Sequence, residues 1–230
     1  MTNKMKDLII LGAGGASYNI IEYVEDINDV KPTWNLLGLF DDNNDLVGTT
    51  ILGYKVIGTI DDAVKYPEAF FINSIGSAND LDLRKRVRDR IPFGDDHFAT
   101  LIHPLAHVSK SAKIGTGCII CPLCSCQADT VIGHDSYITS FTLVGHESHI
   151  GQHCVVAGRT MIAGSAEIGD CTYIGCGSAL KHEMKIGDHC MIGMGCVLWK
   201  DVPPYTKMYA PHARTRDERE REKELLTAKQ

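Results

Sequence analysis

The chain has 230 residues, of which 44% are apolar and 23% are charged, and its formal net charge is −6 at pH 7. This length allows one large or two modest domains, and the negative charge argues against a protein whose main partner is nucleic acid or an anionic membrane. No run approaches the roughly 18–20 apolar residues of a membrane helix, and the first fifteen residues are more typical of a strand entering a glycine turn than of a signal peptide. The sequence therefore predicts a cytoplasmic globular protein.

The first hundred residues alternate predicted strands with predicted helices. An apolar strand, a glycine turn and an amphipathic helix come first, and a charged helix comes last. The segments are, in chain order, residues 6–24, the strand 35–43, the strand and short helix 53–66, the strand 69–77 and the helix 79–91. Strands that alternate with helices predict a small parallel α/β domain of the Rossmann-like type, at residues 1–100.

Three glycines lie between the first strand and the first helix, at Gly12, Gly14 and Gly15. Backbone amides and a helix N-terminus at such a turn favour a phosphate group. The third glycine of the dinucleotide pattern G-x-G-x-x-G is replaced by Ser17, so the pattern alone is weak. The turn predicts an anion site, with a tight turn that binds nothing as the alternative.

From Val108 to Leu198 an aliphatic or nearly aliphatic residue recurs every six residues, for sixteen hexads without an insertion. Glycine often follows it, and a small residue usually stands four places later. A period of six keeps no residue on one face of an α-helix, so the repeat predicts a β-solenoid in which stacked coils bury a continuous aliphatic column. The glycine is expected to supply backbone conformations that a side chain would obstruct.

The nine cysteines superficially suggest disulfides or zinc, above all at Cys121, Cys124 and Cys126. An odd number without a secretion signal argues against a disulfide framework. Most of them fall on the small or aliphatic positions of the repeat, where a free cysteine packs as a small hydrophobe. We therefore expect buried thiols and no metal.

The ten histidines fall into groups with different expected roles. His146 follows Val144 by two places, so its side chain should project from the wall of the solenoid. The equivalent residue one coil (18 positions) later is Gly164, which should leave room for a substrate, and His182 follows two coils on, at roughly 9–10 Å. Glu147 can hold one imidazole nitrogen while the other faces substrate. The remaining histidines are expected to be structural near the linker (His97, His103, His107), exposed at turns (His153, His189) or beside the site (His149).

These motifs together resemble the bacterial sugar-nucleotide N-acetyltransferases that acylate UDP-4-amino-sugars. The segments "LIILGAGG", "GLFDDN", "GYKVIGTIDDA" and "ATLIHPLAHVSKSAKIG", followed by hexads, cover residues from about 7 to 203. The hexad is that of the hexapeptide-repeat acyltransferases, which implies a left-handed parallel β-helix at residues 101–210, followed by a charged tail at 211–230. The family also implies a homotrimer, acetyl-CoA as donor, and a place in polysaccharide or glycan biosynthesis.

The resemblance also assigns roles to particular residues. His146 matches the family's general base and Glu147 the acid that orients it. The nucleotide site would include Gly12, Gly14, Gly15, Asp41 and Asp42, and the acetyl-CoA site Gly164, Cys176 and Met194. The chain departs from the family where a histidine and a lysine are missing from the glycine turn, and where Val155 replaces a second histidine.

Four functions are compatible with the pattern. The first is N-acetylation of a UDP- or dTDP-linked amino-sugar by direct transfer, for which a base and an oxyanion donor suffice and no metal is required. The others are O-acetylation, as of a sialic acid, a non-catalytic sugar-nucleotide-binding scaffold, and a γ-class carbonic anhydrase with zinc on His146 and His182.

Overall fold

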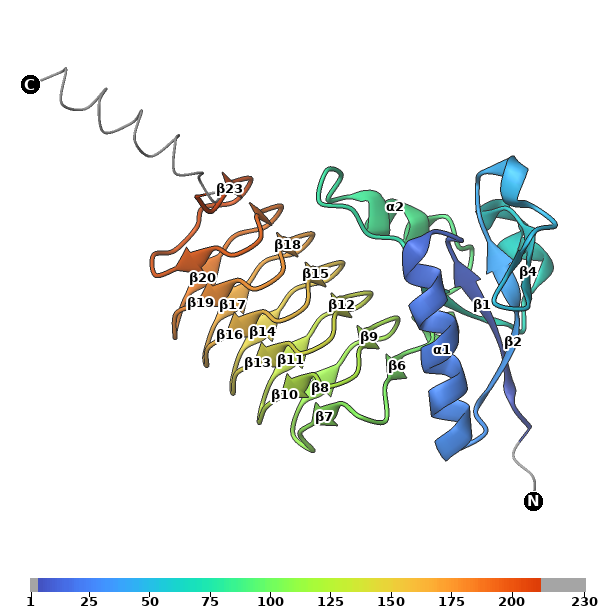
Figure 1. The fold of residues 1–230 in the computed structure, drawn as a ribbon, viewed down its shortest axis with the longest axis horizontal. Coiled ribbons are helices and arrows are strands. Elements are labelled where there is room, and N and C mark those ends of the chain that lie inside the picture. The colour runs from blue at the N-terminus through green and yellow to red at the C-terminus, as the bar shows by residue number, and fades with distance from the viewer. Residues whose placement is uncertain (1–3, 212–230) are drawn as a thin grey trace, which may run out of the picture.

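The computed structural model describes residues 4–211, which form an N-terminal α/β part followed by a parallel β-helix (Figure 1). The predicted fold class is therefore confirmed. None of the helices in this part of the chain has both the length and the apolar character that crossing a bilayer requires. Of the tail that the sequence suggests at 211–230, residues 212–230 lie outside the described residues.

The α/β part is a five-stranded sheet in the order β3-β4-β2-β1-β5, parallel except for the β3–β4 hairpin. Strand β1 occupies an interior position, and its residues Leu8 to Leu11 are fully buried. The predicted short helix after β4 is a 3-10 helix. The elements are β1 (Lys6–Leu11), α1 (Gly15–Val30), β2 (Trp34–Phe40), β3 (Thr50–Ile51), β4 (Tyr54–Gly58), β5 (Phe70–Asn73) and α2 (Leu83–Asp89), with 3-10 turns at Asn44–Leu46, Ile60–Lys65 and Asp95–His97.

The β-helix has three faces, and each strand pairs with the strand 18 residues later. We call them face 1 (β6, β9, β12, β15, β18, β21, β23), face 2 (β7, β10, β13, β16, β19, β22) and face 3 (β8, β11, β14, β17, β20). The strands are β6 (Leu101–Ile102), β7 (His107–Val108), β8 (Lys113–Ile114), β9 (Ile119–Ile120), β10 (Ser125–Cys126), β11 (Val131–Ile132), β12 (Tyr137–Ile138), β13 (Leu143–Val144), β14 (His149–Ile150), β15 (Val155–Val156), β16 (Met161–Ile162), β17 (Glu167–Ile168), β18 (Tyr173–Ile174), β19 (Ala179–Leu180), β20 (Lys185–Ile186), β21 (Met191–Ile192), β22 (Val197–Leu198) and β23 (Lys207–Met208).

The glycine that follows the aliphatic residue has a different purpose from the expected one. A side chain on Gly145 would place its Cβ 2.5 Å from the backbone nitrogen of Gly164 in the next coil, so glycine is needed there for close stacking of the coils. The left-handed backbone conformation falls two places later, for example at Glu147 with φ 57°. That position repeats every six residues and mostly holds residues other than glycine.

The expected packing of the cysteines is confirmed. Eight of the nine are buried, and all nine are free thiols; Cys176 is the exposed one. Burial raises the pKa of the thiols of Cys118, Cys121, Cys126 and Cys154 to about 12. These thiols stay protonated at neutral pH and are poor nucleophiles.

The α/β part packs on face 1 and on the corner between faces 3 and 1 (Figure 1). A buried ion pair lies at this contact: Arg84 Nη2 is 3.0 Å from Asp135 Oδ1, and both side chains are almost fully buried. Asp135 also lies within hydrogen-bond distance of Asn73 Nδ2 (3.3 Å) and His153 Nδ1 (3.2 Å). At the other end of the contact, His103 Nε2 is 2.8 Å from Asp26 Oδ2 on α1. The helix expected to be merely charged therefore anchors the two parts of the chain to each other.

Candidate active site

His146 and Glu147 lie at the corner between faces 2 and 3, in the turn that joins β13 to β14. The imidazole Nδ1 of His146 is 3.0 Å from Glu147 Oε2. Both side chains are more than half exposed, at 53% and 64%. The pair thus has the arrangement expected of an oriented base, with Nδ1 held by a carboxylate and Nε2 directed elsewhere.

The ring of His146 lies directly over Gly164. A Cβ on Gly164 would stand 2.6 Å from His146 Nε2, which shows that the imidazole occupies the space that glycine leaves. The expectation that this space is kept open for substrate is therefore wrong. Because the ring leans over the intervening coil, its centroid is 6.1 Å from that of His182, closer than the expected spacing of two coils.

His182 has a looser acidic partner than His146. Its Nε2 is 3.6 Å from Glu183 Oε1, beyond hydrogen-bond distance. The backbone nitrogen of Gly164, between the two histidines, donates no hydrogen bond within residues 4–211. The corner thus combines one oriented imidazole with one unused amide donor.

Two other histidines differ from expectation. His153 and His189 were expected to be exposed at turns, but their side chains are only 10% and 27% exposed because the α/β part covers this corner. His189 Nε2 is 2.9 Å from Asp82 Oδ1. His103, expected to be structural, is buried against α1, whereas His107 is exposed on face 2.

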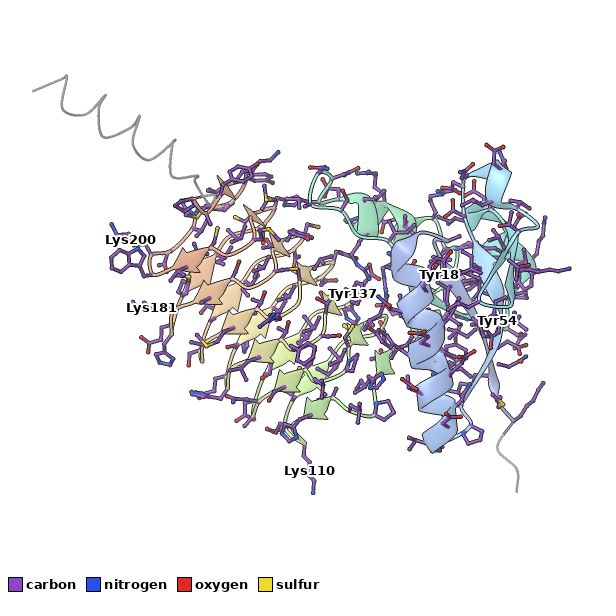
Figure 2. The ribbon with its side chains drawn as sticks, in the orientation of Figure 1. Tyr18, Tyr54, Lys110, Tyr137, Lys181 and Lys200 are labelled. Atoms are coloured by element: carbon purple, nitrogen blue, oxygen red, sulfur yellow. The ribbon has the colours of Figure 1, made fainter. Side chains whose placement is uncertain are left out.

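The residues assigned to acetyl-CoA are not all at one corner of this chain. Gly164 lies at the corner between faces 2 and 3, whereas Cys176 and Met194 lie at the corner between faces 1 and 2. Beyond His182, Lys181 and Lys200 lie at the same corner as His146, at the C-terminal end of the β-helix (Figure 2).

The glycine turn forms the floor of a hollow of about 340 Å³, lined by Gly12, Gly14, Gly15, Ala16, Asp41, Ser74, Ile75 and Gly76. The structure therefore brings the three predicted glycines together with Asp41. Gly12 has φ 97°, and a Cβ there would meet Ile75 at 2.5 Å, whereas Cβ atoms on Gly14 and Gly15 would meet nothing within 4 Å. Asp41 Oδ2 accepts a hydrogen bond from the Ala13 amide at 2.7 Å and so fixes the turn.

Asp42 points into a neighbouring hollow of about 300 Å³. Arg90 Nη2 donates to Asp42 Oδ1 at 3.0 Å, and the hydrogen bonds from this guanidinium hold the pKa of the carboxyl below its usual value. Asp42 is therefore an ionised carboxylate with a fixed cationic partner, and it does not line the glycine hollow.

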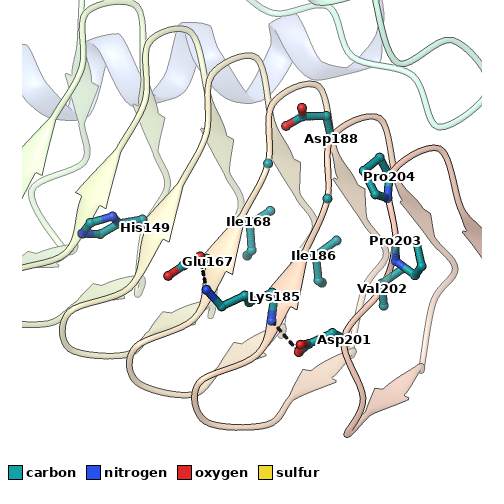
Figure 3. A pocket seen from close by; sticks show the side chains of 12 residues that line it. His149, Glu167, Ile168, Lys185, Ile186, Asp188, Asp201, Val202, Pro203 and Pro204 are labelled. Carbon is teal, nitrogen blue, oxygen red and sulfur yellow. Dashed lines mark hydrogen bonds and ion pairs between the residues drawn. The ribbon is translucent and has the colours of Figure 1, made fainter.

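The largest cavity, of about 590 Å³, lies on face 3 and contains none of the predicted site residues (Figure 3). Glu167 and Lys185 project into it, and Lys185 Nζ is 2.9 Å from Glu167 Oε2. Asp201 closes the row by accepting from the Lys185 backbone amide at 2.9 Å. Since carboxylates flank its lysine, this cavity is not suited to a phosphate.

Comparison with known proteins assigns the first part of the chain. Residues 7–91 match the model of the PglD N-terminal domain. The N-terminal part of this chain is a PglD N-terminal domain. A curated relative, UDP-N-acetylbacillosamine N-acetyltransferase of Bacillus subtilis (strain 168), is 44% identical over 54 residues. That match spans 24% of this chain and 24% of the relative's length.

Solved structures share the whole fold, including the PglD N-terminal domain and the β-helix. Perosamine N-acetyltransferase from Caulobacter crescentus, as a histidine-to-asparagine mutant with CoA and GDP-perosamine, is 23% identical, with TM-score 0.75 and coverage of 89% of this chain and 93% of that one. The acetyltransferase domain of PglB from Neisseria gonorrhoeae with acetyl coenzyme A is 23% identical, with TM-score 0.78 and coverage of 89% and 96%. The predicted resemblance to hexapeptide-repeat sugar-nucleotide N-acetyltransferases is confirmed by the domain match and the shared fold.

Several lining and anchoring residues escaped the sequence analysis. Ser74, Ile75 and Gly76 line the hollow next to the glycines of the PglD N-terminal domain. They follow a predicted parallel strand, and ligands bind at the carboxyl ends of such strands, so position alone could have indicated them. Arg84 and Val87 share the buried face of α2, but nothing in the sequence indicated Asp135 as the partner of that arginine.

Proposed function

We propose that this chain is an acetyl-CoA-dependent N-acetyltransferase that acylates the amino group of a nucleotide-linked amino-sugar. In this proposal the domain at residues 1–100 holds the nucleotide-sugar and the β-helix at 101–210 holds the donor. The single observation that carries the proposal is the His146 ring, hydrogen-bonded to Glu147 at Nδ1 and lying over Gly164 with Nε2 outward.

The proposed reaction is a direct transfer. The amine nitrogen attacks the thioester carbon, His146 Nε2 accepts the amine proton, and the C–S bond breaks to release CoA. Glu147 holds the Nδ1 proton and stabilises the imidazolium that forms. The unused amide of Gly164 is the candidate donor to the developing oxyanion. Because the buried thiols are protonated, a cysteine acyl-enzyme has no support among them.

Positive charge at the far end of the corner supports acetyl-CoA as donor. Lys200 lies three coils beyond His146 on the same corner, roughly 14 Å at about 4.8 Å per coil, with Lys181 beside it. The exposed indole of Trp199 adjoins them. We propose that these residues bind the CoA phosphates and adenine, while the thioester reaches His146 and Gly164. Cys176 and Met194 then contribute from a second copy of the chain.

The topology argues that one chain alone cannot complete the site. The hollow of the PglD N-terminal domain adjoins face 1, where Gly76 approaches Val155, and His146 lies at the opposite corner. A sugar-nucleotide in that hollow therefore cannot reach the His146 of its own chain. We propose a homotrimer in which each acceptor is presented to the histidine of a neighbour.

Turnover is the test of this function. A panel of UDP-, dTDP- and GDP-linked amino-sugars and their hydroxyl analogues, each offered with acetyl-CoA, is expected to give CoA release with an amino-sugar only. Turnover of the hydroxyl analogues or of sialic acid would instead establish O-acetylation. No turnover with any of them, together with tight sugar-nucleotide binding, would support the scaffold.

Gly164→Ala separates catalysis from folding. The new methyl group meets the mobile end of His146 and not the backbone, so the ring swings away at little cost in stability. We expect a lower kcat, an unchanged thermal midpoint and loss of the His146 geometry. As a control, Gly14→Ala adds a methyl group where nothing lies within 4 Å and should leave kcat intact at saturating substrate. Wild-type turnover by Gly164→Ala would contradict the assignment.

Phe141→Asp is expected to dissociate the trimer. Leu105, Leu123 and Phe141 are exposed at one position of the corner between faces 1 and 2, and Met161 and Val197 are exposed on the adjoining face 2. Such an apolar stripe marks an interaction surface. Light scattering should show monomers with little activity, whereas Leu52→Asp, an exposed leucine of the β3–β4 hairpin, should stay trimeric. A fully active wild-type monomer would refute the shared site.

The glycine hollow should bind sugar-nucleotides and not NAD. Ser17 replaces the third glycine of the dinucleotide pattern and is fully buried, with its hydroxyl bonded to the Gly14 carbonyl at 2.7 Å. Calorimetric titration should therefore show UDP- or dTDP-sugar binding that Asp41→Ala weakens, because the Ala13 amide loses its partner. Saturable binding of NAD at micromolar concentration would overturn the assignment.

A further inference from the structure

A group of three potential metal ligands lies away from His146, at the corner between faces 3 and 1. It consists of Asp82, Cys171 and His189, whose ligand atoms all lie within 4.8 Å of one another. Cys171 and His189 hold the same position in successive coils, 18 residues apart, and Asp82 is the residue before α2 in the N-terminal domain. The group therefore joins the two parts of the chain.

We propose that this group binds a divalent metal ion, Zn²⁺ by preference, which clamps α2 to the β-helix. Thiolate, imidazole and carboxylate are the three ligand types that zinc uses, and a thiolate with an imidazole disfavours Mg²⁺ and Ca²⁺. Two anionic ligands, from Asp82 and Cys171, balance the charge of the ion. Water takes the fourth position.

The geometry needs little adjustment to receive the ion. Ligand atoms around a tetrahedral zinc are separated by roughly 3.3–3.7 Å. Asp82 Oδ1 and His189 Nε2 are now 2.9 Å apart and would separate by a few tenths of an ångström, on the order set by those bond lengths. The ring of His189 stacks on Tyr205, with centroids 5.0 Å apart and planes at 14°, and this stacking holds Nε2 toward the group.

Cys171 is a suitable third ligand. Its side chain is buried, and burial together with the charge of Asp82 raises the pKa of the thiol to about 11. Without metal the thiol is protonated and inert. Metal binding forms the Zn–S bond and releases the thiol proton to solvent, so affinity rises with pH.

Cobalt is the spectroscopic probe for this site. Full-length protein, stripped with a chelator and titrated with Co²⁺ under reducing conditions, should develop a thiolate-to-cobalt charge-transfer band that saturates at one equivalent and disappears on addition of Zn²⁺. Cys171→Ser should abolish the band, and Asp82→Asn and His189→Gln should weaken Co²⁺ binding. The matched controls are Cys176→Ser, at the exposed cysteine, and His149→Gln, and both should keep the wild-type band.

Thermal unfolding provides a second readout that does not depend on colour. Zn²⁺ should raise the thermal midpoint of the wild-type protein and of Cys176→Ser, but not that of Cys171→Ser, because only a folded site binds the ion. Circular dichroism of the stripped variants verifies that each is folded before titration. Absence of a band in the wild-type protein, or a band that survives Cys171→Ser, would overturn the proposal and leave the group as an ion pair between the two parts of the chain.

Discussion

His146→Asn lowers kcat by about 10²–10⁴-fold, the usual contribution of a general base, while acetyl-CoA affinity is largely retained. The amide of Asn can occupy the position over Gly164 but cannot accept the amine proton at neutral pH. Steady-state kinetics with the best amino-sugar nucleotide, together with calorimetric titration of acetyl-CoA, checks both parts of this expectation. Glu147→Ala should have a smaller effect, because Glu147 orients the imidazole at 3.0 Å and does not carry the transferred proton.

The control for this prediction is His182→Asn. His182 lies at the same corner, is similarly exposed at 51%, and has an acidic neighbour, but that carboxylate is 3.6 Å away. We expect a modest change in its kinetics. If His182→Asn abolishes turnover and His146→Asn does not, the base is His182.

Arg84→Met has the largest expected effect on stability. Removing the guanidinium leaves the carboxylate of Asp135 buried and uncompensated, which typically costs about 3–5 kcal/mol. The substitution also deprives the Ile75 carbonyl of its 2.7 Å hydrogen bond, next to the nucleotide hollow. Urea unfolding followed by fluorescence measures the loss in free energy of unfolding, and binding of the sugar-nucleotide should weaken together with it.

The double variant Arg84→Met with Asp135→Asn tests the origin of this loss. Asn is neutral and tolerates the left-handed backbone conformation at this position, where φ is 53°. We expect it to be more stable than Arg84→Met alone, since no buried charge remains. Arg86→Met is the matched control on the same helix, because Arg86 is 55% exposed and its ion pair with Asp80 contributes little. Equal stability of Arg84→Met and Arg86→Met would show that the buried pair does not anchor the domains.

The sequence by itself determined the β-helix and the local part of the site. A coil can bury its aliphatic residue only if that residue recurs at every strand, so the period of six prescribes the architecture without knowledge of distant contacts. His146 and Glu147 are neighbours in the chain, and their hydrogen bond needs no tertiary information. The hollow at Gly12, Gly14 and Gly15 follows in the same way from a strand, a turn and a helix that are consecutive.

Only the tertiary structure decided which face of the β-helix receives the N-terminal domain. Repeats of 18 residues place Asp135, His153, Cys171 and His189 in one column, but the period does not say whether water or α2 covers it. Two of these histidines were therefore expected to be exposed and are partly or largely covered instead. Similarly, the lean of His146 over Gly164 depends on the rotamer of a side chain, which a repeat pattern does not encode. Contacts between residues 50 or more positions apart, such as Arg84 with Asp135, arise only when two separately specified surfaces pack together.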